Sequence, residues 1–246
     1  MKRIFRKILI CCLIGIISKS WLDGASASPI RLACVGDSIT WGFGIPNRME
    51  NSYPAQLAVM LGTNWEVRNF GVNGATLLHQ GDVPYVKKKA YTQALAFRPD
   101  FVVVDFGAND SKHPNDGSLD SQNAVNNWQY KTNFARDYGQ LIAAFRRANP
   151  RANIFICLPT PDYPGRWGIS DKTIHVEMIP MIRRIARQSH VGLIDLYRAL
   201  SGRKELFPDT VHPNAAGAKL MAAAIYRAIR AEDTSVKPAS GLQGRR

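Results

Sequence analysis

The chain has 246 residues, of which 46% are hydrophobic and 21% charged, and its formal net charge is +13. This composition excludes a mostly disordered chain and fits one α/β domain with a substantial core. The basic residues are scattered and form no block interleaved with aromatic residues, which argues against nucleic-acid binding. Scattered positive charge is typical of a solvated surface, and it also suits an anionic envelope or acidic polysaccharide surroundings.

Residues 1–27 have the pattern of a secretory signal peptide. Residues 1–7 are basic, residues 8–17 are almost entirely apolar, and Ala25-Ser26-Ala27 fits an A-x-A cleavage site. The apolar part is short for a bilayer span, which disfavours a retained membrane anchor. Removing this segment, with its five basic residues and one acidic residue, would lower the net charge from +13 to +9. We therefore expect a secreted or periplasmic protein with no stable membrane insertion after cleavage.

Short apolar runs, separated by longer segments, predict the strands of a parallel sheet. They are residues 30–35, 66–70, 101–106, 153–158 and 192–196. Cys34 and Cys157 lie inside two of these runs. A disulfide between them is an alternative, but both fit small apolar core residues better.

The segments between these runs predict helices. Ser52-Tyr53-Pro54 opens one helix, and Asn149-Pro150 ends another whose apolar face extends from Phe134 to Phe145. Further helices are expected at about residues 86–97, at 170–189 with a kink at Pro180, and at 215–230.

Strands that alternate with helices over residues 28–231 predict a single three-layer α/β/α sandwich with a five-stranded parallel sheet. Residues 232–246 are polar and contain Gly, Ser and Pro, and we expect a disordered tail there.

Several strand ends carry residues that suit acyl transfer. This chemistry requires a nucleophile, a base, a group that orients the base, and hydrogen-bond donors for the oxyanion. Ser38 is the candidate nucleophile, and Asp209 and His212 are spaced so that a carboxylate can orient an imidazole. Gly71 could offer a backbone N–H, and Asn109 a side-chain amide. Taken alone, the segment around Ser38 could equally be a turn that caps a helix.

A second Asp-x-x-His pair, Asp110 and His113, competes with Asp209 and His212. We expect Asp110 to hold the loop that aims Asn109, and His113 lies in a glycine- and asparagine-rich insertion, so the later pair is preferred. The histidines and cysteines have no metal-ligand spacing, so no metal is predicted. Acyl-enzyme chemistry of this kind requires no cofactor.

Four blocks of the sequence resemble those of the SGNH hydrolases, also called the GDSL esterase/lipase superfamily. They are Gly36-Asp37-Ser38-Ile39, Gly71, Gly107-Ala108-Asn109-Asp110 and Asp209-Thr210-Val211-His212. Four blocks in order are much more specific than any one of them. The resemblance implies a flavodoxin-like fold, with Ser38 as nucleophile, His212 as base and Asp209 as its orienter. It also implies an oxyanion hole made by the N–H groups of Ser38 and Gly71 and the amide of Asn109.

The sequence at residues 66–76 and 206–214 is similar to sialate O-acetylesterase-like proteins and carbohydrate acetylesterases. This resemblance implies removal of acetyl groups from a glycan or a small-molecule ester. Aromatic residues in the predicted loops suit stacking on sugar rings, although ordinary packing also explains them. They are Trp41, Tyr85, Trp128, Tyr163 and Trp167. Three alternatives remain open: a lysophospholipase or thioesterase for longer acyl chains, a non-catalytic carbohydrate-binding protein, and acyl transfer to another sugar.

Overall fold

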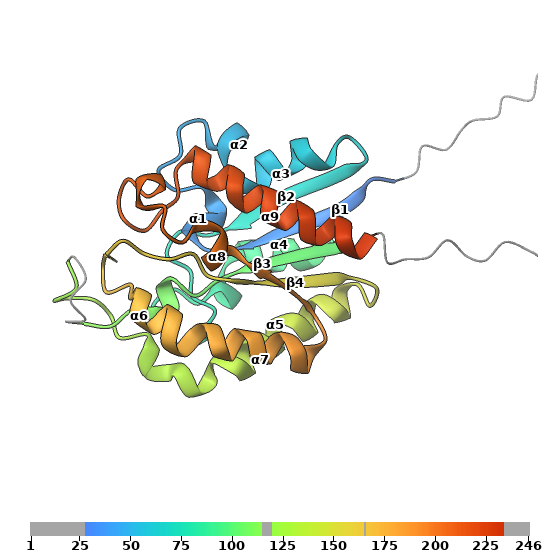
Figure 1. The fold of residues 1–246 in the computed structure, drawn as a ribbon. Coiled ribbons are helices and arrows are strands. Elements are labelled where there is room, and N and C mark those ends of the chain that lie inside the picture. The colour runs from blue at the N-terminus through green and yellow to red at the C-terminus, as the bar shows by residue number, and fades with distance from the viewer. Residues whose placement is uncertain (1–27, 115–119, 165, 234–246) are drawn as a thin grey trace, which may run out of the picture.

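The computed structural model describes residues 28–114, 120–164 and 166–233, which form an α/β/α sandwich (Figure 1). The predicted signal peptide lies outside the described residues, and so does the predicted tail from residue 234 onward. The last helix runs to Asp233, so the first two residues of the predicted tail are helical. Within the described ranges, no helix has the length and apolar character needed to cross a bilayer.

The sheet is parallel, with the strand order β2-β1-β3-β4-β5. The strands are β1 (Ile30–Gly36), β2 (Trp65–Gly71), β3 (Phe101–Asp105), β4 (Asn153–Leu158) and β5 (Gly192–Asp195). In register, Gly36 pairs with Gly71 on one side and with Asp105 on the other, so the carboxyl ends of three strands lie level. From β1 the chain adds β2 on one side, and it then adds β3, β4 and β5 on the other side. Open parallel sheets bind ligands at such a switch point, which here lies between β1 and β3.

The inner strands of the sheet consist mainly of apolar residues that are buried on both faces. Residues 32–35 of β1 and 102–104 of β3 are fully buried, as expected for strands covered by helices on both sides. Cys34 and Cys157 are free and buried, and their strands are separated by β3. They are core residues as predicted, and the alternative of a disulfide between them is wrong.

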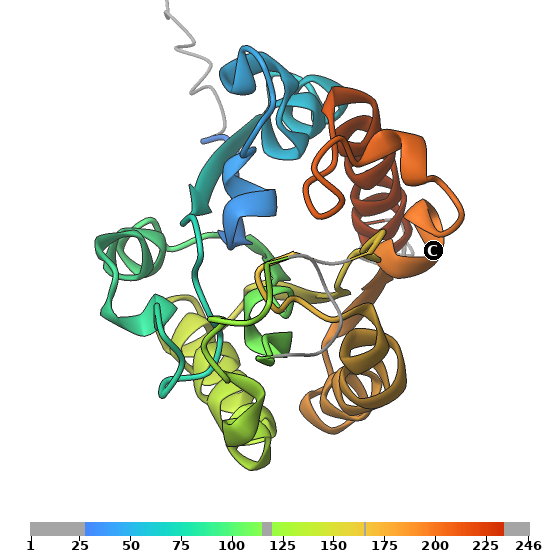
Figure 2. The same ribbon diagram turned by 90° about the vertical axis from the view of Figure 1, so that its left-hand side faces the viewer.

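Helices cover the two faces of the sheet. Helices α3 and α9 pack together on one face, and α4, α5 and α7 lie on the other (Figure 1). Figure 2 looks onto the end of the molecule where the loops that follow the strands gather. The α-helices are α1 (Ser38–Trp41), α2 (Arg48–Asn51), α3 (Tyr53–Leu61), α4 (Lys89–Ala96), α5 (Phe134–Ala148), α6 (Asp171–Thr173), α7 (Ile179–Ser189), α8 (Leu196–Leu200) and α9 (Ala215–Asp233). Shorter turns are η1 (Tyr85–Lys87), η2 (Asn109–Ser111), η3 (Trp128–Asn133), η4 (Ile174–Met178) and η5 (Lys204–Leu206).

Two predicted helices are divided in the structure. Ser170 caps the segment after β4 by accepting a hydrogen bond from Thr173 N, but a π-helical turn, η4, separates α6 from α7. Pro180 lies in the first turn of α7, and because it has no N–H the regular ladder of backbone bonds is interrupted there. The helix predicted at residues 86–97 begins as the 3₁₀ turn η1 and becomes α-helical only in α4.

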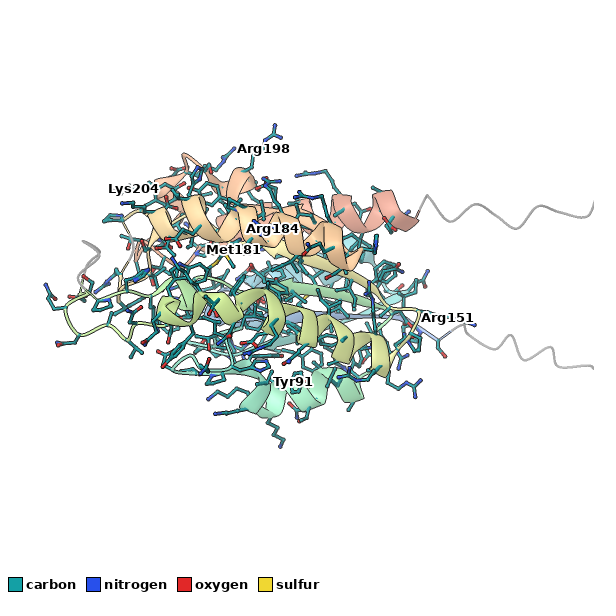
Figure 3. All side chains as sticks on the ribbon, turned by 90° about the horizontal axis from the view of Figure 1, so that it is seen from below. Tyr91, Arg151, Met181, Arg184, Arg198 and Lys204 are labelled. Atoms are coloured by element: carbon teal, nitrogen blue, oxygen red, sulfur yellow. The ribbon has the colours of Figure 1, made fainter. Side chains whose placement is uncertain are left out.

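Positive charge is spread over the surface. Arg151, Arg184, Arg198 and Lys204 are exposed and belong to different segments of the chain, and Arg151 lies at the other end of the view from Lys204 (Figure 3). This distribution agrees with the prediction of scattered, solvated basic residues.

Candidate active site

Ser38 is the first residue of α1, directly after the end of β1. Asp37 begins this short helix, since its Oδ1 accepts a hydrogen bond from Ile39 N at 2.9 Å. The abrupt strand-to-helix turn requires glycine at position 36, because a Cβ there would lie 2.1 Å from Thr40 Oγ1. Ser38 is therefore held at the carboxyl edge of the sheet, with 8% of its surface exposed.

His212 and Asp209 lie in the loop before α9, and hydrogen bonds join them to Ser38. The Ser38 Oγ–His212 Nε2 distance is 2.8 Å, and the His212 Nδ1–Asp209 Oδ2 distance is 2.7 Å. Asp209 Oδ1 also accepts hydrogen bonds from Val211 N at 3.1 Å and His212 N at 2.7 Å. The aspartate thus fixes both the loop backbone and the imidazole ring.

The environment of His212 favours its neutral form. Burial lowers the pKa of His212 below the ordinary value of 6.5, although its hydrogen bond and attraction to Asp209 act in the opposite direction. Burial alone would raise the pKa of Asp209, but the hydrogen bonds from the backbone and ring of His212 outweigh it and lower that pKa. Near pH 7 the pair is therefore an ionised carboxylate beside a neutral imidazole, which can accept a proton.

A pocket of about 220 Å³ opens over Ser38 and His212. Its walls carry aromatic and polar side chains, and Ser38 and His212, joined by a hydrogen bond, lie at its floor. The lining residues are Ser38, Phe43, Asn73, Gly74, Asn109, Lys112, Trp167, Ile169 and His212.

Asn109 reaches this pocket from η2, the turn that follows β3. Its Nδ2 donates to Ala75 O at 3.2 Å and to Asp37 Oδ2 at 3.4 Å. Both contacts are longer than the usual length of about 2.9–3.0 Å. A negatively charged oxygen in the pocket would be a stronger acceptor than the neutral carbonyl of Ala75.

Gly71, which the sequence analysis predicts as a backbone donor, lies outside the pocket lining. This residue ends β2, and its N–H donates to Asn69 Oδ1 at 2.9 Å. Its lack of a side chain serves packing instead, since a Cβ would lie 2.2 Å from Trp41 N in α1. Gly74, three residues later, lines the pocket with φ +74°. Both glycines occur in one short stretch, and the sequence holds no signal that distinguishes them.

The competing pair, Asp110 and His113, has other partners. The fully buried carboxylate of Asp110 accepts hydrogen bonds from Leu77 N at 3.1 Å and Leu78 N at 2.8 Å. His113 N donates to Gly168 O at 2.8 Å. Asp110 thus ties the turn that carries Asn109 to the loop after β2, as the sequence suggested.

The aromatic residues singled out in the sequence separate into two groups. Trp167 lines the pocket, with its ring 5.9 Å from that of His212. Tyr85 and Trp128 are 1% exposed and belong to the core. Trp41 and Tyr163 are absent from the pocket lining. The sequence analysis missed Phe43, whose ring lies 4.6 Å from that of His212; it follows α1 without a motif.

A parallel sheet of this order, with serine, histidine and aspartate joined by hydrogen bonds at its carboxyl edge, defines an α/β protein of the SGNH hydrolase fold. Among the described residues, no group of three or more His, Cys, Asp and Glu side chains is placed to hold a metal ion. The sequence matches the GDSL-like lipase/acylhydrolase family over residues 34–220, and the chain belongs to that family. It contains a carboxylic ester hydrolase domain of this type.

The chain is 39% identical over 232 residues to an acetylxylan esterase of Xylanibacter ruminicola. The match covers 86% of this chain and 46% of that protein, so the chain spans about half the length of this relative.

Solved structures share the fold at low sequence identity. A carbohydrate acetylesterase from Sinorhizobium meliloti, Est24, has a TM-score of 0.63 at 19% identity, covering 82% of this chain and 99% of that one. The inhibitor-bound aryl esterase of M. smegmatis has a TM-score of 0.64 at 16% identity, with coverages of 82% and 98%. The lipase/acylhydrolase from Enterococcus faecalis has a TM-score of 0.62 at 22% identity, with coverages of 86% and 99%. These likenesses establish the fold alone.

Proposed function

We propose that the protein is a secreted serine esterase that removes O-acetyl groups from carbohydrate. The observation that carries this proposal is the chain of hydrogen bonds from Asp209 through His212 to Ser38, at the floor of a pocket. The relative that is 39% identical and named acetylxylan esterase supports the choice of acyl group and of carbohydrate.

In the proposed mechanism, Ser38 Oγ attacks the ester carbonyl while His212 Nε2 takes its proton. The tetrahedral intermediate collapses to an acetyl-enzyme, and protonated His212 gives the proton to the departing sugar oxygen, which leaves as a hydroxyl group. Water, deprotonated by the same nitrogen, then attacks the acetyl carbonyl, and the second tetrahedral intermediate collapses to acetic acid as His212 returns the proton to Ser38 Oγ. Asp209 accepts the Nδ1–H of His212 throughout, which orients the ring and stabilises its protonated form.

The oxyanion hole of this mechanism consists of the N–H groups of Ser38 and Gly74 and the amide of Asn109. Gly74 takes the place that the sequence analysis gave to Gly71, because Gly74 lines the pocket and the N–H of Gly71 is engaged by Asn69. Donors held in place before the reaction stabilise the developing charge without reorganisation.

The pocket walls favour a sugar as the alcohol part of the ester. Phe43 and Trp167 are 42% and 37% exposed, and they are the two aromatic residues among the exposed large hydrophobic residues of the described chain. Both flank His212. An aromatic face beside polar groups such as Asn73 and Lys112 suits a ring that has both C–H and hydroxyl faces.

Secretion is supported by residues 1–27 of the sequence, whose basic, apolar and small-residue parts follow the order of a signal peptide. N-terminal sequencing of the exported protein tests this part of the proposal. A mature chain that begins near Ser28 is expected, and retention of residues 1–27 would contradict cleavage.

Acetate release from acetylated xylan and other acetylated glycans, measured beside Ser38→Ala, tests the activity. We expect release by the wild type and none by the variant. A series of p-nitrophenyl esters, from acetate to octanoate, separates an acetylesterase from a hydrolase of longer acyl chains, and a preference for octanoate would contradict the proposal. Trp167→Ala should lower kcat/KM for an acetylated xylo-oligosaccharide much more than for ethyl acetate, which has no ring to stack.

A further inference from the structure

We propose that Asn127 is a positioning residue that sets the geometry of the oxyanion hole by holding Asn109 against the loop after β2. This inference rests on the proposed function. Asn127 precedes η3 in a segment without any recognisable motif, yet it is fully buried. A fully buried polar side chain outside the catalytic set must be satisfied by specific partners.

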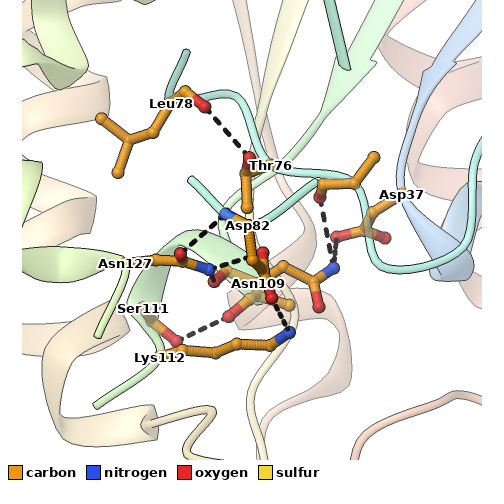
Figure 4. A network of polar contacts seen from close by, with 10 residues as sticks. Asp37, Thr76, Leu78, Asp82, Asn109, Ser111, Lys112 and Asn127 are labelled. Atoms are coloured by element: carbon orange, nitrogen blue, oxygen red, sulfur yellow. Dashed lines mark hydrogen bonds and ion pairs between the residues drawn. The ribbon is translucent and has the colours of Figure 1, made fainter. Parts of the chain in front are cut away.

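The amide of Asn127 uses both of its N–H groups and its oxygen. Its Nδ2 donates to Asn109 O at 2.8 Å and to Asp82 Oδ1 at 2.9 Å, while its Oδ1 accepts from Asp82 N at 3.0 Å (Figure 4). Only a group with two donors and an acceptor can make this set. An aspartate at position 127 could donate to neither partner and would face the carboxylate of Asp82.

These bonds join the two segments that supply the proposed oxyanion donors. Asn109 belongs to η2, and Asp82 lies in the loop that begins after β2 and contains Gly74. Asp110 makes a second connection between the same segments by accepting hydrogen bonds from Leu77 N and Leu78 N. Asn127 and Asp110 therefore connect η2 to the loop that carries Gly74 through two separate sets of hydrogen bonds, which set the distance between the two segments.

The network reaches the rim of the pocket through an ion pair. Asp82 Oδ2 lies 3.1 Å from Lys112 Nζ, and Lys112 lines the pocket (Figure 4). Lys112 thus pairs with Oδ2 of Asp82, while Asn127 donates a hydrogen bond to its Oδ1. The amide of Asn109 donates to Ala75 O and Asp37 Oδ2 instead, so Asn127 contacts only the backbone of Asn109 and does not occupy its side-chain amide.

A double-mutant cycle on p-nitrophenyl acetate hydrolysis by the full chain tests this role. Asn127→Ala should lower kcat about 10-fold with KM within about 2-fold, because stabilisation of the transition state is lost and substrate binding is not. In an Asn109→Ala background the same substitution should lower kcat less than about 2-fold, because the side-chain donor that Asn127 positions is then absent. Equal losses in the two backgrounds would overturn the proposal.

Asn149 provides a matched control at the opposite end of β3. Its Nδ2 donates to Pro99 O at 3.0 Å and Asp100 Oδ1 at 3.2 Å, and its Oδ1 accepts from Arg151 N at 3.1 Å. Asn149→Ala removes a similar set of hydrogen bonds and should lower Tm without changing kcat. A loss of kcat equal to that of Asn127→Ala would show a general structural effect and overturn the positioning role.

Two further variants keep the outcomes distinct. If Asn127→Ala does not fold, Asn127→Ser, which retains one donor, replaces it in the cycle with a smaller expected loss of kcat and the same criterion. Ser38→Ala separates the two proposals. Activity that survives Ser38→Ala would overturn the proposed function and this inference with it, whereas Ser38-dependent activity with an additive cycle would overturn the inference alone.

Discussion

Replacing Asp209 by asparagine should abolish most of the turnover while leaving the loop in place. The carboxylate accepts hydrogen bonds through Oδ1 from Val211 N and His212 N, and through Oδ2 from His212 Nδ1 at 2.7 Å. Asparagine can keep the two backbone bonds with its oxygen. Its NH₂ group then faces Nδ1 and forces the tautomer in which Nε2 carries the proton, so His212 can no longer accept a proton from Ser38.

The expected loss in kcat is about 10⁴-fold, the size found when the same exchange reverses the histidine tautomer in a Ser-His-Asp protease, or about 5 kcal/mol of transition-state stabilisation. The assay is initial-rate hydrolysis of p-nitrophenyl acetate, with Tm measured in parallel. Asp195→Asn is the control, because Asp195 also accepts a backbone N–H, that of Arg198, at the start of α8. A kcat for Asp209→Asn within about 10-fold of the wild type would refute the assignment of Asp209 as the orienting group.

The same pair sets the pH dependence. In the proposed mechanism neutral His212 is the active form, and burial lowers its pKa below 6.5. Activity should therefore be lost, as pH falls, with a midpoint below 6.5 in a kcat/KM profile. A midpoint at or above 6.5 would contradict the desolvated environment of the ring.

Three substitutions test other parts of the structure. Asn109→Ala should lower kcat about 10²–10³-fold with Tm nearly unchanged, and near-normal turnover would remove Asn109 from the oxyanion hole. Gly71→Ala should lower the free energy of unfolding by ~2 kcal/mol or more in urea melts, since the new Cβ would lie 2.2 Å from Trp41 N; unchanged stability would refute this close approach. Burial raises the pKa of Asp105 from 3.8 to about 7. The folded state therefore binds more protons than the unfolded state between these values, and stability from this group falls as pH rises through that window. Asp105→Asn should then raise the free energy of unfolding by ~1–3 kcal/mol at pH 8 and by less at pH 5, and an equal effect at both pH values would contradict the shift.

Much of the architecture follows from local pattern. The buried strands were predictable because short apolar runs between glycine and proline signals have few alternatives in a chain of this size. Pro180 predicted a kink in one helix, whereas the structure has a π-helical turn before α7, and the choice depends on how α6 and α7 pack, which the local sequence does not specify.

The site divides in the same way. Ser38, Asp209 and His212 could be singled out because their residue types and spacing suit acyl transfer. The structure brings them within hydrogen-bond distance of one another. Gly71 and Gly74 could not be distinguished, since a glycine has no side chain to mark its role and only the fold shows that Gly74 lines the pocket.

The sequence by itself determined the fold class, the order of the strands along the chain and the serine, histidine and aspartate that hydrogen bonds join, because hydrophobicity and side-chain chemistry belong to each residue. Only the tertiary structure decided that Gly74 lines the pocket, that Phe43 and Trp167 flank His212, and that the amide of Asn127 donates a hydrogen bond to the carbonyl of Asn109. These depend on contacts between segments far apart in the chain, and the direction of a backbone group or the partner of an ordinary asparagine is fixed only when those segments pack.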